Sequence, residues 1–284
     1  MPMSNEPLTP ETAEQESGGT SAIDYLGMTL HSGVAPLETR YAQINSCYRR
    51  LPVAYRSFTY VNSVIEGVIP PEKYAFAADE TERGERMSRY NMVQAMRAVE
   101  KLQLAGRHVS FVTARCSPRL VRQDDFYGYV KSLLEERGFL YPERLCLEFP
   151  RSLFFEDPEQ ARMAVLSMKL LKVKTMLTGC GDKDAPLTPL LNLPVDYVVL
   201  SPWLTVLADH RDHSASVAAL IAFLRSIPCD VIGEGAYNDE QISALSRADC
   251  FGYIPSAGYE GTATHGSLRM TLEDAVAQPE EEAM

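Results

Sequence analysis

Five charged side chains stand at the ends of short apolar runs, where they could form a binding or catalytic site. Arg56 lies in AYRSFTY, Arg115 in TARCSP, Glu148 and Arg151 in LEFPRS, and Glu234 in GEGAYNDEQ. Carboxylates can hold a divalent cation or pair with guanidinium groups, and guanidinium groups can hold a phosphate. Which of these chemistries applies depends on how the fold brings the five residues together.

The runs alternate with segments of helical spacing along most of the chain. Two neighbouring runs, Tyr41–Ser46 and Pro52–Asn62, predict an initial β-hairpin. Six later strands are predicted at HVSFVTA, RLCLEF, VKTML, DYVVLS, CDVIGE and ADCFGYI. Helices are expected after Pro70 and Pro71 and at Arg86–Leu104, Phe126–Glu136, Pro158–Leu171, Leu187–Leu191, Ser214–Ser226 and Asp239–Ser246. This α/β pattern of eight strands predicts a TIM-type (β/α)8 barrel, whose functional residues lie at the carboxyl ends of the strands.

Composition and charge disfavour several classes of function. The chain has 284 residues and a formal net charge of −11, from 38 acidic and 27 basic residues. This balance disfavours non-specific binding to nucleic acid or to an anionic membrane. No apolar stretch approaches the roughly 18 residues of a membrane span, and the N-terminus lacks the regions of a signal peptide. We therefore expect a cytoplasmic protein with no nucleic-acid partner and no membrane insertion.

The six cysteines show no metal-binding spacing. None belongs to a Cys-x-x-Cys pair, and most lie in or beside apolar runs: Cys47, Cys116, Cys146, Cys180, Cys229 and Cys250. We expect buried free thiols that pack as small hydrophobic side chains in a reducing compartment.

The composition changes near both ends of the chain. Residues 1–20 are rich in Pro, Glu, Ser, Thr and Gly, which predicts a disordered acidic leader. We divide the rest into an N-terminal extension (21–34), a barrel (35–258) and a mostly disordered tail (259–284).

Several segments, taken in chain order, resemble the EAL family of cyclic di-GMP phosphodiesterases over roughly residues 35–258. LCLEFPRS resembles Leu-x-Leu-Glu-x-Thr-Glu-Ser, and VIGEGAYNDEQ resembles Val-Ile-Ala-Glu-Gly-Val-Glu-x-x-x-Gln. LPVD follows Thr178 at the spacing that separates the family's Asp-Asp-Phe-Gly and Leu-Pro-Val-Asp motifs, and Gly181, Leu187 and Leu190 match between them. EGVIPPEKY resembles the segment after the signature tripeptide. The resemblance implies an EAL-like barrel that begins with a β-hairpin.

The same resemblance implies that the family's site has been replaced. Enzymes of the family hold divalent cations with carboxylates and an Asn, and activate water with help from a Lys. Only Glu148 and Glu234 are kept. The changed positions are Arg56 (with Ser57 and Phe58, for Glu-Ala-Leu), Arg115 (for Asn), Arg151 (for Glu), Thr178 and Gly179 (for Asp-Asp), Val199 and Ser201 (for Lys and Asp) and Tyr237 (for Glu). Two carboxylates beside three guanidinium groups cannot hold such a cation, so we expect no metal, no cofactor and no catalytic residue.

Two interpretations of Arg56, Arg115 and Arg151 remain open. They can pair with Glu148 and Glu234 in place of metal contacts, or they can form an anion site that holds a ligand phosphate. We favour structural pairing.

Three hypotheses of function follow. The first is a catalytically inactive EAL-like regulator that binds an unidentified protein partner in bacterial signalling. The alternative is a metal-independent receptor for cyclic di-GMP; Tyr60, however, stands where such receptors usually keep an Arg. The third is an enzyme with altered chemistry, for which the sequence offers no nucleophile–base pair.

Overall fold

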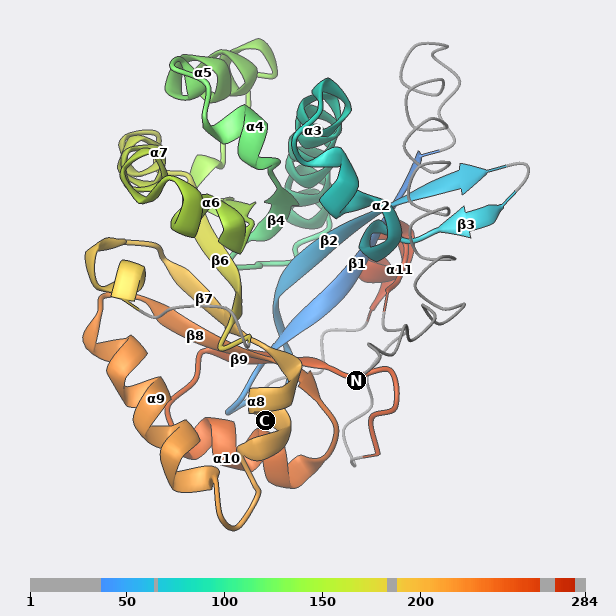
Figure 1. Ribbon diagram of the computed structural model, residues 1–284. Helices are drawn as coiled ribbons and strands as arrows, with labels where there is room; N and C mark the ends of the chain where they lie inside the picture. Colours follow the sequence, from blue (N-terminus) through green and yellow to red (C-terminus); the bar gives the residue numbers. More distant parts are fainter. Residues whose placement is uncertain (1–36, 64–65, 183–187, 261–268, 279–284) are drawn as a thin grey trace, which may run out of the picture.

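The chain folds into a closed barrel of eight strands, seen in Figure 1. The computed structural model describes residues 37–63, 66–182, 188–260 and 269–278. The barrel strands are β1 (Leu37–Ser46), β2 (Pro52–Ser63), β4 (Val112–Arg115), β5 (Leu145–Phe149), β6 (Lys174–Cys180), β7 (Tyr197–Leu200), β8 (Asp230–Ala236) and β9 (Gly252–Pro255). β1 runs antiparallel to β2 and β9, and all other neighbouring barrel strands are parallel. The predicted TIM-type barrel with its initial hairpin is confirmed.

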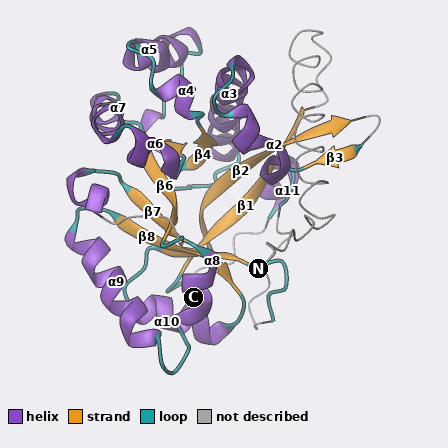
Figure 2. Cartoon of the chain, viewed as in Figure 1, coloured by secondary structure: helices purple, strands orange, loops and turns teal. Residues whose placement is uncertain are grey.

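Helices surround the barrel, as Figure 2 shows. They are α2 (Pro71–Ala78), α3 (Glu82–Leu104), α4 (Pro118–Val121), α5 (Phe126–Glu136), α6 (Arg151–Glu156), α7 (Pro158–Leu170), α8 (Pro202–Leu207), α9 (Ser214–Ser226), α10 (Asp239–Arg247) and α11 (Leu272–Ala277), with 3₁₀ helices at Pro142–Arg144 and Thr188–Asn192. The predicted ends of α5 and α9 are confirmed. The strand β3 (Gly67–Ile69), which extends the sheet beyond β2, was not predicted.

Apolar side chains fill the inside of the barrel. Side chains alternate between the two faces of a strand, so each barrel strand sends every second residue inward. The inner cluster is Ala42, Ile44, Ala54, Phe111, Cys146, Met176, Tyr197, Val199, Ile232 and Ile254. Burial of each large apolar side chain stabilises the fold by roughly 1.5–3 kcal/mol. The packed interior leaves the carboxyl ends of the strands as the place for a site.

Short helices follow three of the parallel strands and were not predicted. α4, α6 and α8 begin directly after β4, β5 and β7 and are four to six residues long, too short to show a helical period. Pro118 and Pro202 stand in the first turns of α4 and α8, and Ser117 caps α4 by accepting a hydrogen bond from the Leu120 amide. These helices carry or support residues of the site described below.

A C-terminal segment, which we call the strap (residues 269–278), lies against the outside of β1. Met270 pairs with Tyr41 through two main-chain hydrogen bonds, and α11 contacts β1 and α3. Thr271 and Asp274 form a reciprocal capping box at the start of α11. The strap falls within the tail (259–284) that was predicted to be mostly disordered; its helix is too short for the periodicity used there. The predicted leader and extension lie outside the described residues.

All six cysteines lie in the described part of the chain. Cys47, Cys116, Cys146, Cys180 and Cys250 are buried, Cys229 is half-buried, and all six thiols are free, which confirms the interpretation as packing residues. In the part of the chain that the structure describes, no helix is long and apolar enough to cross a membrane.

Candidate functional site

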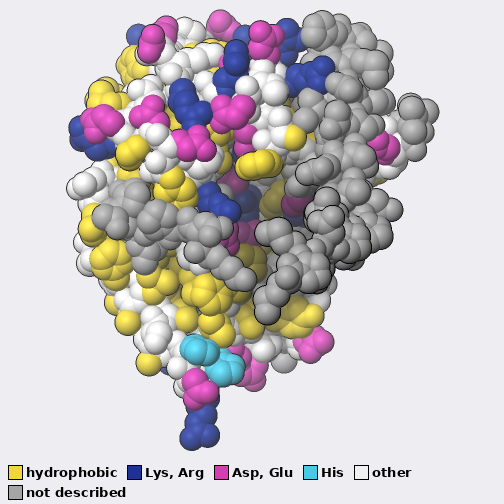
Figure 3. All heavy atoms as spheres, viewed as in Figure 1, with side chains coloured by type: hydrophobic (Ala, Val, Ile, Leu, Met, Phe, Trp, Pro, Cys, Tyr) yellow, Lys and Arg dark blue, Asp and Glu magenta, His cyan; other side chains and the backbone are white. Residues whose placement is uncertain are grey.

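The middle of β2 and the carboxyl ends of β4, β5 and β6 line a cavity of about 370 Å³, which we call the mouth cavity. α2 lines one side of it, and the start of α6 lines the other. Basic and acidic side chains gather in the hollow on this face, as the space-filling view in Figure 3 shows. Charged groups of both signs therefore face one another among the apolar and neutral side chains that line the cavity.

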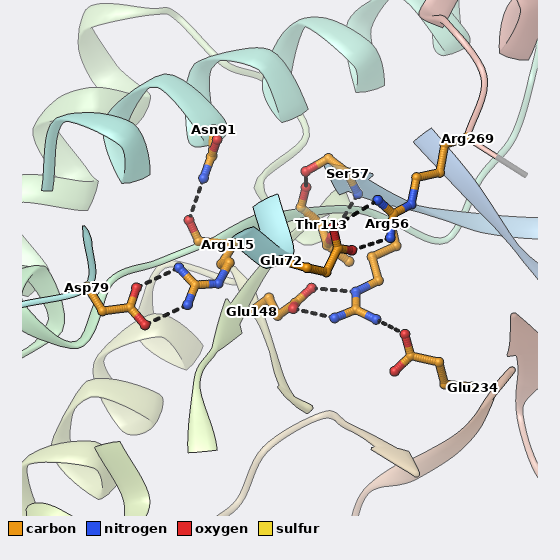
Figure 4. Close-up of polar contacts among 10 residues, drawn as sticks. All are labelled: Arg56, Ser57, Glu72, Asp79, Asn91, Thr113, Arg115, Glu148, Glu234 and Arg269. Atoms are coloured by element: carbon orange, nitrogen blue, oxygen red, sulfur yellow. Dashed lines mark hydrogen bonds and ion pairs between the residues drawn. The ribbon is translucent and has the colours of Figure 1, made fainter. Parts of the chain in front are cut away.

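Arg56, Glu148 and Glu234 form what we call the Arg56 network; Arg56 and Glu148 line the floor of the cavity, and Glu234 contacts Arg56. The Arg56 guanidinium donates two hydrogen bonds to Glu148, from Nε at 2.9 Å and from Nη2 at 2.6 Å, as drawn in Figure 4. Its Nη1 donates to Glu234 Oε1 at 2.6 Å. Burial opposes the charge on Arg56, but the carboxylates of Glu148 and Glu234 outweigh it and raise the arginine pKa. One buried guanidinium thus joins the two acidic residues kept from the family motifs.

Arg115 has a different partner from the one expected. It forms a bidentate ion pair with Asp79, in which Nη1 donates to Oδ1 and Nη2 donates to Oδ2, each at 2.7 Å. Asp79 ends α2 and is buried; burial raises its pKa, while Arg115 works in the opposite direction. The motif positions predict a pair with Glu148 or Glu234 instead, and they give no sign of Asp79 because that residue is not at a strand end. α2 brings it to the cavity from the side.

Arg151 also departs from the expected pairing. It begins α6, and its Nη1 donates to Asp182 Oδ2 at 2.6 Å. Both side chains are well exposed, at 42 % for Arg151 and 38 % for Asp182. Asp182 lies two residues after the end of β6, the strand that carries Thr178 and Gly179. The expected contact with Glu148 or Glu234 is replaced by a local pair at the rim of the cavity.

The other predicted positions divide into two groups. Thr178 and Gly179 line the mouth cavity, whereas Val199, Ser201 and Tyr237 do not. Val199 belongs to the apolar cluster inside the barrel, and Tyr237 is 43 % exposed on the surface. Ser201 is fully buried before α8, and among the described residues its hydroxyl has no hydrogen-bond partner. The structure therefore brings together six of the ten predicted positions at the cavity. A seventh, Glu234, does not line the cavity but accepts a hydrogen bond from Arg56, which does.

A fourth arginine, which sequence reasoning missed, reaches the same face. Arg269 donates from Nη1 to the Tyr60 hydroxyl at 2.8 Å and pairs with Glu72 through both terminal nitrogens. Its guanidinium carbon lies 3.8 Å from the centroid of the Phe58 ring. Burial opposes its charge, but Glu72 and Tyr60 raise the pKa of Arg269. Only long-range contacts identify this residue, since it lies more than 200 positions from β2.

Every guanidinium at the mouth has a carboxylate partner. Four arginines (Arg56, Arg115, Arg151 and Arg269) meet five acids (Glu72, Asp79, Glu148, Asp182 and Glu234). The paired groups therefore carry four positive and five negative charges. Within the described ranges, no group of three His, Cys, Asp or Glu side chains could hold a metal ion.

Comparison with known proteins agrees with this architecture. The EAL domain family matches residues 36–253. The chain belongs to the EAL-domain family. A relative from Caulobacter vibrioides, described as an uncharacterized signaling protein, is 30 % identical over 112 residues, which cover 39 % of this chain and 14 % of the relative. The chain thus matches only a small part of that protein's length.

Solved structures show the same fold for this EAL domain. The EAL enzyme Bd1971, in its form bound to cAMP and cyclic di-GMP, aligns with a TM-score of 0.77 and 14 % identity, covering 94 % of this chain and 69 % of Bd1971. The PaMucR phosphodiesterase in complex with cyclic di-GMP aligns with a TM-score of 0.75 and 18 % identity, covering 90 % of this chain and 99 % of PaMucR. At such identities the likeness concerns the barrel and not its chemistry. The family match ends before the strap.

Proposed function

We propose that this EAL domain is a catalytically inactive regulatory protein that acts in bacterial signalling by binding another protein. The observation that carries the proposal is the Arg56 network. Arg56 stands where the resemblance to EAL enzymes implies a metal-binding Glu, and its guanidinium lies between Glu148 and Glu234. The Arg56 guanidinium thus occupies the carboxylate oxygens of Glu148 and Glu234 that a divalent metal ion would need as ligands.

The residues at the mouth do not fit a divalent cation. Mg²⁺ and Ca²⁺ take several oxygen ligands at about 2.0–2.6 Å. Both oxygens of Glu148 and one of Glu234 already accept hydrogen bonds from Arg56. A metal ion would have to displace a buried guanidinium and bind beside its positive charge. Without that ion, a bound water would not be converted to hydroxide near neutral pH, which supports the loss of phosphodiesterase catalysis.

Altered chemistry on the same barrel has less support. The Ser57 hydroxyl donates to the Thr113 carbonyl at 2.6 Å, so it has no base to activate it. Burial raises the pKa of Cys180 to about 12, and it raises the pKa of Cys116 still further. Such thiols stay protonated at neutral pH and make poor nucleophiles.

The receptor hypothesis has one feature in its favour. Arg151 lines the cavity, makes a single hydrogen bond to Asp182 and is 42 % exposed, so it could exchange that carboxylate for a ligand phosphate. Bd1971 and PaMucR are described in complexes with cyclic di-GMP, at low identity to this chain. The five acids that surround the four arginines weigh against a doubly anionic ligand, because each new contact would break an existing ion pair. We therefore favour a protein partner.

A calorimetric titration with cyclic di-GMP, with and without Mg²⁺, tests the proposal together with a hydrolysis assay in Mg²⁺ and Mn²⁺. We expect no hydrolysis and no heat of binding at high micromolar ligand. Magnesium-independent binding that disappears in Arg151→Ala would establish the receptor hypothesis instead. Hydrolysis in the presence of either metal would contradict the proposal outright.

If the titration gives no binding, affinity capture from cells of the source organism becomes the next step. The matched bait is the triple variant Arg56→Met, Glu148→Gln and Glu234→Gln, which removes the charges of the Arg56 network together and so leaves no buried carboxylate unpaired. A partner that binds the native domain in a fixed ratio, and survives purification by gel filtration, would support the protein-binding role.

A further inference from the structure

The strap reaches the mouth through one side chain. Arg269, its first residue, lies over the Phe58 ring, donates to the Tyr60 hydroxyl and pairs with Glu72, a contact drawn beside Arg56 in Figure 4. An aromatic face, a phenol hydroxyl and a carboxylate together form a complete acceptor for a guanidinium group. The chain fills this acceptor with its own arginine.

The rest of the strap is fixed to the outer wall of the barrel. Met270 exchanges main-chain hydrogen bonds with Tyr41 at 2.8 and 2.9 Å, and α11 packs against α3 and β1. The Tyr55 hydroxyl reaches the Ala275 carbonyl at 3.5 Å. The strap therefore connects the outside of β1 to the rim of the mouth cavity.

Arg269 acts on the helix that lines the cavity. α2 has eight residues, and Tyr74 and Ala78 pack it into a small apolar cluster. Three polar contacts add to this packing: Asp79 pairs with Arg115 at the end of the helix, Tyr74 donates to the Thr59 carbonyl at 2.6 Å, and Glu72 pairs with Arg269 in the first turn. Glu72 and Pro71 both line the cavity. The first turn of α2 thus depends on a contact that comes from the far end of the chain.

We propose that Arg269 is a latch: its release and return open and close the mouth cavity at the first turn of α2, while the rest of the strap stays on the barrel wall. Withdrawal of Arg269 uncovers the Phe58 ring and leaves the Glu72 carboxylate without its guanidinium. The first turn of α2 then loses this ion pair and loosens, while Tyr74 and Asp79 still hold the rest of the helix. Each contact of Arg269 is individually modest, so a partner that binds the strap or enters the cavity can release the latch. This inference does not depend on whether the domain has lost catalysis.

Hydrogen–deuterium exchange followed by mass spectrometry tests the latch on the full chain. We expect Arg269→Ala to speed exchange of the α2 amides by about five- to thirty-fold, a range that corresponds to one or two kcal/mol. Exchange in β4 to β8 should stay as in the native protein, because these strands do not touch Arg269. Unchanged exchange in α2 would overturn the proposal, and so would a uniform increase over the whole barrel.

Two further variants separate the latch from a general effect of strap stability. Lys101→Ala removes an exposed ion pair between α3 and Glu273 of the strap, far from the mouth, and should leave exchange in α2 unchanged. Arg269→Lys keeps a cation over the Phe58 ring and beside Glu72, so it should retain much of the protection that Arg269→Ala removes. Loss of protection in Lys101→Ala equal to that in Arg269→Ala, or a loss in Arg269→Lys as large as in Arg269→Ala, would contradict the latch.

Discussion

The floor and the rim of the mouth cavity both hold an arginine paired with acid, yet they are different kinds of structure. On the floor, Arg56 is buried and makes three hydrogen bonds to Glu148 and Glu234. On the rim, Arg151 makes one hydrogen bond to Asp182 and remains well exposed. A buried charge has no water to replace a lost partner, whereas an exposed one does. The same residue type therefore has a structural role at the floor and remains exchangeable at the rim.

Removal of the floor guanidinium should have the largest effect. Arg56→Ala leaves the buried Glu148 carboxylate without a counterion and should lower the free energy of unfolding by about 3–5 kcal/mol. Chemical denaturation followed by circular dichroism measures the change. The triple change of Arg56 to Met with Glu148 and Glu234 to Gln is the control, since it removes the charges together and should cost much less. A loss under 1 kcal/mol in Arg56→Ala would show that the floor behaves like the rim.

Arg115 should be intermediate between the two. Its pair with Asp79 has two hydrogen bonds, and Asp79 is buried while the Arg115 side chain is 28 % exposed. Arg115→Ala should destabilise the fold by roughly 1.5–3 kcal/mol, as expected for a charge-assisted hydrogen bond at a buried acid. Denaturation measures it, and Asp79→Asn should recover part of the loss in the Arg115→Ala background. If Arg115→Ala lowered the free energy of unfolding as much as Arg56→Ala, burial of the arginine would not explain the difference between the two sites.

Acid should weaken the latch. Burial works against the charge of Glu72, but its hydrogen bond from Arg269 prevails and lowers the carboxyl pKa. Because the folded-state pKa is the lower one, Glu72 stabilises the closed latch fully above its unfolded-state pKa and loses that effect as pH falls through the folded-state pKa. The stability difference between the native protein and Arg269→Ala should therefore shrink at acid pH. A difference that stays constant from neutral to acid pH would contradict this role of Glu72.

Arg151 should give the smallest effect. Arg151→Ala removes an exposed pair and should change the free energy of unfolding by about 0–1 kcal/mol. A melting curve at low and high salt measures it, with little difference expected in either. A loss above 2 kcal/mol would mean that the rim pair is as structural as the floor network.

The barrel could be predicted from local patterns. Apolar residues recur every second position in a strand and about every 3.6 positions in a helix, and a short stretch of sequence shows either period. The same is true of Ser214–Ser226, which is a helix at those bounds. α4, α6 and α8 were missed because six residues or fewer cannot show a period. The strap was missed for the same reason.

The partners of the arginines could be predicted only in part. The resemblance to the EAL family predicts Arg56 near Glu148 and Glu234, because each of the three residues occupies a site position in a family motif on a predicted strand. The structure pairs them. Asp79 and Asp182 lie on a helix end and a loop, whose positions depend on tertiary packing rather than on strand order. Arg269 comes from a segment that the family pattern does not include. Charge pairs that join distant segments leave no local signal in one sequence.

Binding of Mn²⁺ to the purified domain tests the central claim most directly, because the ion reports on the space that Arg56 fills. Electron paramagnetic resonance counts free Mn²⁺ during a titration, with an active EAL phosphodiesterase as the positive control. We predict no stoichiometric binding up to millimolar metal, in the presence or absence of cyclic di-GMP. One bound Mn²⁺ per chain at micromolar concentration, lost when Glu148 is changed to Gln, would show that the guanidinium gives way to metal and would contradict the account.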